Sequence, residues 1–475
     1  MSWTDGLSNN RPLALLGLGT FCAVLALAML KVDGIFILGG LLALGVGVLL
    51  LSFPFACVPI YFIFLYTRPG DAFPFLAPLR LNALIVLAMA ASFLLRVLVF
   101  RTTPVRKNLQ IVVVVAFLGT IGISIFGSFY ASATLEKFMD IVRVIIMVVL
   151  VTHIVDSMAK LRITVWSILL SLALLATINF GGWAMGLYII DNGGSGGIVG
   201  GFLGDGNDFA LAMNVMMPFA IAFVFIEKSK WLKLLAIYVI LIYIAAIVAT
   251  YSRGGLLGLV AVFGMMFVLY IARTREWGKG LMLIIVAAIL GVIALSVFAP
   301  DSFQKRMGTI TEFEEDESAL GRLDAWEAGL RMLKDHPLFG VGAGAFPDAY
   351  GRKYMPPDAI EARWRAAHSL YVEISAELGF TGITLLMFLA FLIFRDARRV
   401  HRYGLMDPRV QRDNRIFADA IVSGLIGYLV SGAFLSVGYY PHIYILSVFS
   451  ILALDLTREA AEAGAATESE EIYAR

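Results

Sequence analysis

Charge and cysteine are both scarce in this sequence. Of the 475 residues, 15% are charged and two are cysteine, whereas roughly a quarter of the residues in an ordinary soluble domain are charged. Cys22 and Cys57 cannot form a disulfide framework or a cysteine-based metal site, and both lie in apolar runs as small core residues. The net charge of +2 gives no indication of nucleic-acid binding. The low charge therefore argues against a soluble enzyme.

Hydrophobic residues make up 60% of the chain and occur in long runs. Clear examples cover residues 13–30, 111–128, 232–249, 256–272 and 281–299. As helices, runs of about 18 to 20 residues match the thickness of the bilayer hydrocarbon, and they lack the alternation of a transmembrane β-barrel. The first run ends without a convincing cleavage site, so we interpret it as a retained helix rather than a signal peptide. The sequence predicts an all-α polytopic membrane protein.

We expect about 12–14 membrane spans, with about fourteen as the best number. Their centres are expected near residues 21, 43, 60, 88, 119, 147, 176, 216, 241, 264, 290, 382, 426 and 448. Residues 35–66 are apolar throughout but contain Pro54 and Pro59. This stretch forms either two short helices or one kinked helix, which leaves the count open.

Lysine and arginine are concentrated in alternate loops. The basic loops carry Arg96, Arg101, Arg106 and Lys107, then Lys160 and Arg162, then Lys228, Lys230 and Lys233, then Arg273, Arg275 and Lys279, and finally the arginines of residues 395–415. The opposite loops carry single charges, namely Lys31, Arg68, Arg80, Lys137 and Arg253. Because short basic loops remain in the cytoplasm, the segments 191–206, 300–368 and 439–442 are expected on the extracytoplasmic side.

The expected organisation has four segments. Residues 1–299 are N-terminal transmembrane helices, 300–368 an extracytoplasmic loop or cap, 369–456 C-terminal transmembrane helices, and 457–475 an acidic cytoplasmic tail. The loop falls between the eleventh and twelfth expected spans.

The loop is expected to contain a helix of its own. Residues 321–335 carry a helical stripe of apolar side chains, made of Leu323, Trp326, Leu330 and Leu333. The His-Pro pair at 336–337 stops the helix, and residues 340–344 follow as a flexible turn. We expect this segment to fold over the membrane face as a lid or cap.

Three extracytoplasmic side chains are candidates for a site. Arg253 stands in a Ser-Arg-Gly-Gly sequence at the mouth of two apolar helices. It either snorkels to the lipid headgroups or, helped by the glycines, approaches another group closely. Arg322 opens the loop helix and is otherwise a solvated surface charge. His368 stands where the loop re-enters the membrane; histidine accepts a proton readily near neutral pH, although one at a helix start is often structural.

Other polar residues on this side have simpler explanations. Asn207 or Asp208, which follow Asp205 at the end of the Gly-rich loop, are natural helix N-caps. The acidic run at 312–317 is a solvated loop or a site for a divalent cation, without a His or Asp-x-Asp pattern to support a metal. The remaining histidines are His336 and His442 on the outer side and His153 and His401 on the cytoplasmic side.

Taken together, these segments resemble the bacterial O-antigen ligase and O-antigen polymerase superfamily. Residues 253–257, Arg-Gly-Gly-Leu-Leu, match its Arg-x-x-x-Leu element. Gly321-Arg322, Trp326 and the Pro-Leu-Phe-Gly-Val-Gly run at 337–342 resemble the start of the family's large periplasmic loop. His368-Ser369, nine residues, Gly379, two residues and Gly382 reproduce its His-(Asn/Ser/Gln)-x9-Gly-x-x-Gly signature. The resemblance covers roughly residues 200–390, and the family's usual twelve spans differ from the expected fourteen.

The resemblance implies transfer of a glycan from a polyprenyl (undecaprenyl) diphosphate carrier to an acceptor hydroxyl. The implied location is the periplasmic face of the bacterial inner membrane. Guanidinium groups suit phosphate oxygens, so Arg253 and Arg322 are expected to bind the diphosphate. His368 is expected to take the acceptor proton or to orient the acceptor hydroxyl. No metal or cofactor is expected, and the partners are the lipid-linked donor, membrane lipids and an acceptor on lipid A core, glycan or protein.

Other activities remain open. Within the family, a repeat-unit polymerase or a protein O-glycan ligase has the same architecture, and the His368 signature favours ligation. A polysaccharide or lipid transporter also has many helices, and it requires ionisable residues buried near the membrane midplane. Few are evident here, the clearest being Arg143 with Asp140 one turn before it.

Overall fold

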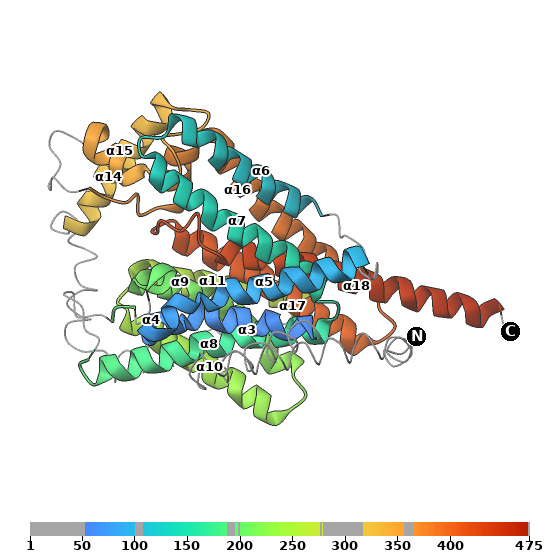
Figure 1. Ribbon diagram of the computed structural model, residues 1–475. Coiled ribbons are helices and arrows are strands. Elements are labelled where there is room, and N and C mark those ends of the chain that lie inside the picture. The colour runs from blue at the N-terminus through green and yellow to red at the C-terminus, as the bar shows by residue number, and fades with distance from the viewer. Residues whose placement is uncertain are drawn as a thin grey trace, which may run out of the picture.

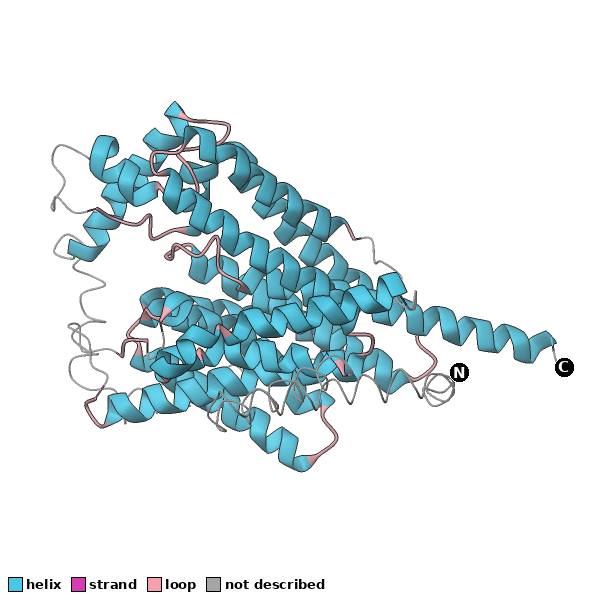
Figure 2. Cartoon of the chain, viewed as in Figure 1, coloured by secondary structure: helices cyan, strands magenta, loops and turns pink. Residues whose placement is uncertain are grey.

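The computed structural model describes residues 53–99, 108–187, 195–197, 200–275, 278, 317–355 and 364–473. In these ranges the regular structure is helical, without a β-strand (Figure 2). The longer elements are α3 (Pro54–Thr67), α5 (Leu81–Leu94), α6 (Leu109–Ser124), α7 (Ala131–Ile154), α8 (Met158–Ala184), α9 (Gly206–Ile226), α10 (Lys230–Ala249), α11 (Arg253–Thr274), α14 (Glu317–Asp335), α16 (Leu370–Val400), α17 (Pro408–Gly432) and α18 (His442–Tyr473), with short α4 (Pro69–Ala72) and α15 (Phe346–Ala349). The expectation of an all-α protein is confirmed for these residues.

The described helices fall where membrane spans were expected. Eight of them are long and apolar enough to cross a bilayer, counted within the described residues. The helices α7 and α18 also cover expected span centres, at residues 147 and 448. The spans expected near residues 21, 43 and 290 lie outside the described residues. Figure 1 shows α14 and α15 at one end of the bundle and the free end of α18 at the other.

The centre of the bundle is formed by α9, which packs against α10, α11 and α17. Asn214 of α9 donates its side-chain N–H to the carbonyl of Gly255, at 2.8 Å, and to Ser431 Oγ of α17, at 3.2 Å. A Cβ atom added at Gly258 would collide with both side chains, so only glycine permits this approach. Small residues let membrane helices pack closely when no hydrophobic force drives them together. This contact fixes the first turns of α11, where Arg253 stands.

The loop helix α14 forms as expected but buries a different face. Its buried side chains are those of Ala325, Ala328 and Met332, whereas Leu323 is 46% and Leu330 63% exposed. The expected stripe of larger apolar residues is therefore not the packed face. The reason is the short distance to α16, because a Cβ at Gly329 would lie 2.4 Å from a methyl group of Val372. Only glycine fits at that point of the contact between the two helices.

The turn expected to be flexible is instead docked on a break in α16. Gly379 adopts φ 65° and ψ −162°, which interrupts the helix and frees carbonyls of the preceding turn. The N–H groups of Val341 and Gly342 donate to the carbonyls of Ala376 and Glu377, at 2.9 and 3.0 Å. In return, Phe380 N–H donates to the Pro337 carbonyl at 2.8 Å. Backbone pairing of this kind joins residues 337–342 to the helix α16 as one unit.

We expect Gly379→Ala to release the docked segment. The left-handed φ costs a non-glycine residue about 1–3 kcal/mol, and the new methyl group would lie 2.5 Å from the Pro337 oxygen. The measurement is limited proteolysis of residues 336–346, compared with that of Gly119→Ala, where a Cβ meets no atom within 4 Å. Equal protease resistance in the two variants would show that the break in α16 does not hold the segment.

Candidate active site

His368 occupies a strained backbone position immediately before α16. Its φ is 47°, in the left-handed region that residues other than glycine seldom adopt. Two hydrogen bonds hold the position: His368 N–H donates to Ser436 Oγ at 2.9 Å, and Trp326 Nε1 donates to the Ala367 carbonyl at 3.0 Å. Such strain persists only where the surroundings enforce it, and it is frequent at functional sites.

The surroundings of His368 keep its imidazole neutral. Burial of the ring lowers its pKa below the ordinary value, and the charges of Arg322 and Arg365 lower it further, while Asp205 acts in the opposite direction. The residue nevertheless retains an exposed face. A neutral imidazole that solvent or substrate can reach is able to accept a proton near neutral pH.

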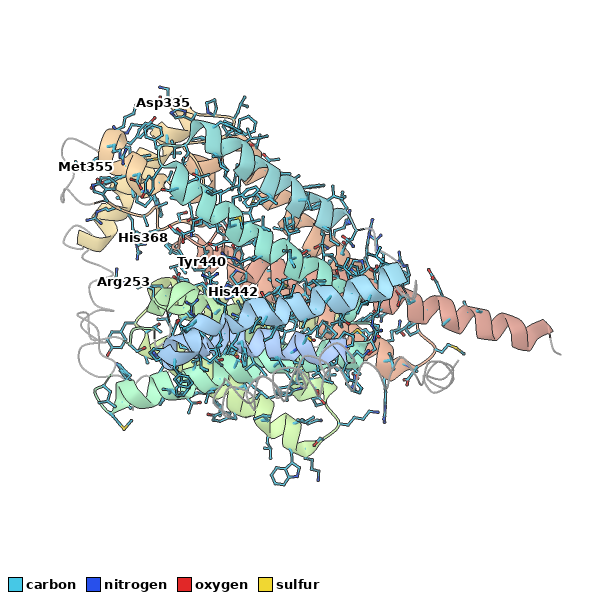
Figure 3. All side chains as sticks on the ribbon, viewed as in Figure 1. Arg253, Asp335, Met355, His368, Tyr440 and His442 are labelled. Atoms are coloured by element: carbon cyan, nitrogen blue, oxygen red, sulfur yellow. The ribbon has the colours of Figure 1, made fainter. Side chains whose placement is uncertain are left out.

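Arg322 and Arg253 are related to His368 in different ways. Arg322 acts on His368 through its charge, whereas Arg253 is connected to His368 through a turn that contacts both residues' segments. Arg322 stands near the start of α14, and its charge acts on His368. Arg253 is the first residue of α11, where Gly254 packs against Phe434. Phe434 and Ser436 belong to the same turn, residues 433–440, and Ser436 holds His368. Figure 3 shows Arg253 and His368 at the end of the bundle that carries α14.

The local sequence explains why Arg253 stands at the N-terminus of α11. Ser252 caps α11, with its Oγ accepting from Gly255 N–H at 2.9 Å. The preceding Tyr251 has φ 55°, which turns the chain sharply into the helix. A side chain at the N-terminus of a helix adds its own charge to the partial positive charge of the free N–H groups there. This helix end is therefore favourable for an anionic group.

The cap of α9 differs from the one expected. Asp205, rather than Asn207 or Asp208, is the N-cap, and its Oδ1 accepts from Asn207 N–H at 2.6 Å. Asp208 is instead the acceptor for Tyr440 OH, at 2.9 Å. Burial and the Asp208 carboxylate raise the pKa of Tyr440, which keeps the phenol protonated and able to donate. Asp208 thus ties the 433–440 turn to α9.

Four residues near this site were not singled out from the sequence. They are Arg365, Glu373, Glu377 and Tyr440. Arg365 is three residues before His368, so its position in the same segment was a usable signal. The two glutamates are charged residues in an apolar span, which is rare enough in membrane helices to be a signal as well. Tyr440 had no signal, because only the tertiary structure brings its turn to α9.

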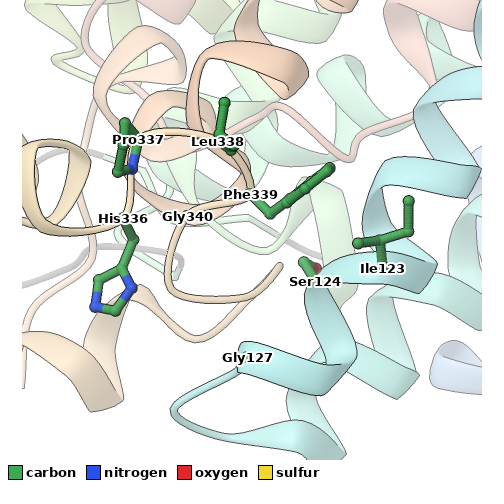
Figure 4. Close-up of a pocket in the computed structure, with 8 residues that line it drawn as sticks. All are labelled: Ile123, Ser124, Gly127, His336, Pro337, Leu338, Phe339 and Gly340. Carbon is green, nitrogen blue, oxygen red and sulfur yellow. The ribbon is translucent and has the colours of Figure 1, made fainter.

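The other two histidines that were predicted on the outer side, His336 and His442, have surroundings of their own. His442 is fully buried, with its ring packed against Phe202 at 5.5 Å between centroids. His336 contacts Phe129 at 5.7 Å and lines a cavity of about 300 Å³ together with Ile123, Ser124, Gly127 and residues 337–340 (Figure 4). No candidate site residue lines this cavity. Its walls are mostly apolar, which does not favour proton transfer.

Metal ligands are not grouped in the part of the chain that the structure describes. Within it, no three His, Cys, Asp or Glu side chains converge as a metal site would require. Residues 312–316 of the acidic run lie outside the described residues.

Comparison with known proteins identifies the segment that contains these side chains. Residues 236–387 match the family model described as O-antigen ligase. This part of the chain is similar to the O-antigen ligases. The resemblance predicted from Arg253, Arg322 and the His368 signature is confirmed, because all of them lie within the matched residues.

One curated relative is similar over part of the chain. It is an uncharacterized protein of Haemophilus influenzae, 25% identical over 194 residues, which are 38% of this chain and 48% of the relative. The chain thus spans about half the length of the curated relative that it matches.

Proposed function

We propose that the protein transfers a glycan from a polyprenyl diphosphate carrier to an acceptor hydroxyl, as an O-antigen ligase does. The supporting observation is His368, a solvent-accessible histidine held at a strained backbone position, with a pKa lowered by burial and by the charge of Arg322, inside the segment that matches the O-antigen ligases. We place the site on the periplasmic face of the inner membrane, with residues 300–368 as its cap. The acceptor is a sugar hydroxyl of lipid A core.

The proposed reaction is a single displacement. The acceptor oxygen attacks the anomeric carbon of the donor glycan, and its proton passes to His368. The bond between that carbon and the diphosphate oxygen breaks, and the carrier diphosphate leaves with the bonding electrons. Arg253 and Arg322 stabilise the charge that develops on it. Attack opposite the leaving group inverts the anomeric configuration, and no step requires a metal.

The first test is reconstitution of the purified protein with a polyprenyl diphosphate glycan and a choice of acceptors. We expect glycan transfer to lipid A core, with activity that survives EDTA because the arginines supply the positive charge. Transfer to a glycan repeat unit would establish a polymerase instead, and transfer to a serine or threonine side chain a protein ligase. Movement of the lipid across vesicles without any transfer would overturn the proposal in favour of a transporter. Loss of activity in EDTA, restored by Mg²⁺ or Mn²⁺, would overturn the metal-free step.

A further inference from the structure

Two buried glutamates follow His368 on α16. Glu373 and Glu377 are one helical turn apart, and they are 9% and 2% exposed. A carboxylate removed from water is costly unless hydrogen bonds replace its hydration. Their partners therefore indicate why these residues stand here.

Glu377 joins two different parts of the chain. Its carboxylate accepts from the backbone N–H of Gly344 at 2.7 Å and of Phe346 at 3.0 Å, both in the docked extracytoplasmic segment. It also accepts from Tyr439 OH at 2.7 Å, in the 433–440 turn. The Nζ of Lys137 lies 5.8 Å from the centre of the ring of Tyr439, the residue whose hydroxyl group donates to Glu377. Both carboxylate oxygens of Glu377 are thus engaged.

Glu373 holds the same turn one helical step closer to His368. Its Oε2 accepts from Gly438 N–H at 2.9 Å. Gly438 is two residues after Ser436, whose Oγ accepts the N–H of the strained His368. The turn is thus bound to α16 by Glu373 and Glu377, and to α9 through the bond between Tyr440 and Asp208.

We propose that Glu373 and Glu377 are positioning residues that clamp the 433–440 turn and the 344–346 segment onto α16 and thereby hold His368 in its reactive geometry. The clamp is a structural inference, and its effect on catalysis rests on the proposed function. The glutamates act through Ser436 and the docked segment, and they do not contact the reacting atoms. The two carboxylates differ in the number of hydrogen bonds that they accept. Glu377 accepts from three donors, whereas Glu373 accepts from one.

The unequal number of donors makes the proposal testable with isosteric variants. An amide has one acceptor oxygen, so Glu377→Gln must turn its NH₂ group toward an N–H or O–H donor and leave that donor unpaired. Glu373→Gln can still accept from Gly438 N–H, whereas Glu373→Leu cannot. We therefore expect Glu377→Gln and Glu373→Leu to open the clamp and Glu373→Gln to preserve it.

Hydrogen exchange measured in nanodiscs tests the clamp without any need for activity. For Glu377→Gln and Glu373→Leu, we expect exchange at residues 340–346 and 436–440 to quicken by roughly tenfold to a hundredfold, with the helices α9 and α17 unchanged. Glu373→Gln and the control Glu327→Gln, an exposed glutamate on α14, should remain within about threefold of the wild type. Unchanged exchange in Glu377→Gln would overturn the clamp.

Kinetics then separate positioning from a purely structural role. In the two open variants, we expect kcat to fall by roughly tenfold to a hundredfold with little change in KM for the donor. The acid limb of the pH profile should also move upward, because a displaced His368 loses the burial that lowers its pKa. Faster exchange with an unchanged kcat and pH profile would show that the clamp does not position His368. A wild-type protein without transfer activity would instead refute the proposed function, and the exchange data would still decide the clamp.

Discussion

Replacing His368 with alanine is expected to lower kcat for glycan transfer by about 10²–10⁴-fold, the usual contribution of a general base. Burial and two neighbouring arginines lower the pKa of the imidazole, so it is neutral and ready to accept a proton at pH 7. The measurement is single-turnover transfer in proteoliposomes, with insertion checked by fluorescence-detected size exclusion.

His336→Ala is the matched control for this variant. His336 directly follows the helix α14, but it contacts Phe129 and an apolar cavity. We expect its activity to remain within about threefold of the wild type, since it takes no part in proton transfer. Activity of His368→Ala at the level of this control would remove His368 from the mechanism.

Replacing Arg322 with glutamine is expected to lower kcat/KM by about 10²–10³-fold, because a donor directed at developing charge is lost. The same change should move the acid limb of the pH profile upward. The Arg322 charge lowers the pKa of His368, so removing it raises that pKa, and a base with a higher pKa becomes protonated at a higher pH. Both effects are measured from kcat/KM between pH 5 and 8.

Lys334→Gln is the control for Arg322→Gln, since Lys334 is an exposed cation in the last turn of the same helix α14. It should leave both the rate and the acid limb unchanged. A fall in rate for Arg322→Gln without any shift of the acid limb would mean that His368 is not the titrating base. A shift without a fall in rate would mean that Arg322 does not bind the diphosphate.

The approximate positions of the helices follow from the sequence alone. A membrane helix must bury about 18 to 20 apolar residues and satisfy its backbone internally, so each apolar run predicts its own span. For this reason α3, α8, α9 and α17 lie at the expected places. The His368 signature was also recognisable, because its glycines stand at fixed positions in the chain.

Packing between elements was not predictable to the same degree. The exposed leucines of α14, the capping of α9 by Asp205 and the docking of residues 337–342 on the break at Gly379 all depend on which helices lie side by side. The order of hydrophobic residues along one helix does not contain that information when the neighbouring surface demands small side chains. The proposed functions of Glu373 and Glu377 could not be predicted for the same reason, since their hydrogen-bond donors are 31 to 65 residues away along the chain.

The sequence by itself determined that this chain is a polytopic helical membrane protein, and its motifs indicated Arg253, Arg322 and His368 as candidates. Hydropathy and spacing are local properties, so these conclusions needed no three-dimensional arrangement. Only the tertiary structure decided that the charge of Arg322 acts on His368 and that one turn, residues 433–440, links His368 to Arg253. Those relations arise where helices distant in sequence meet, and the physical reason is that burial and charge act through space rather than along the chain.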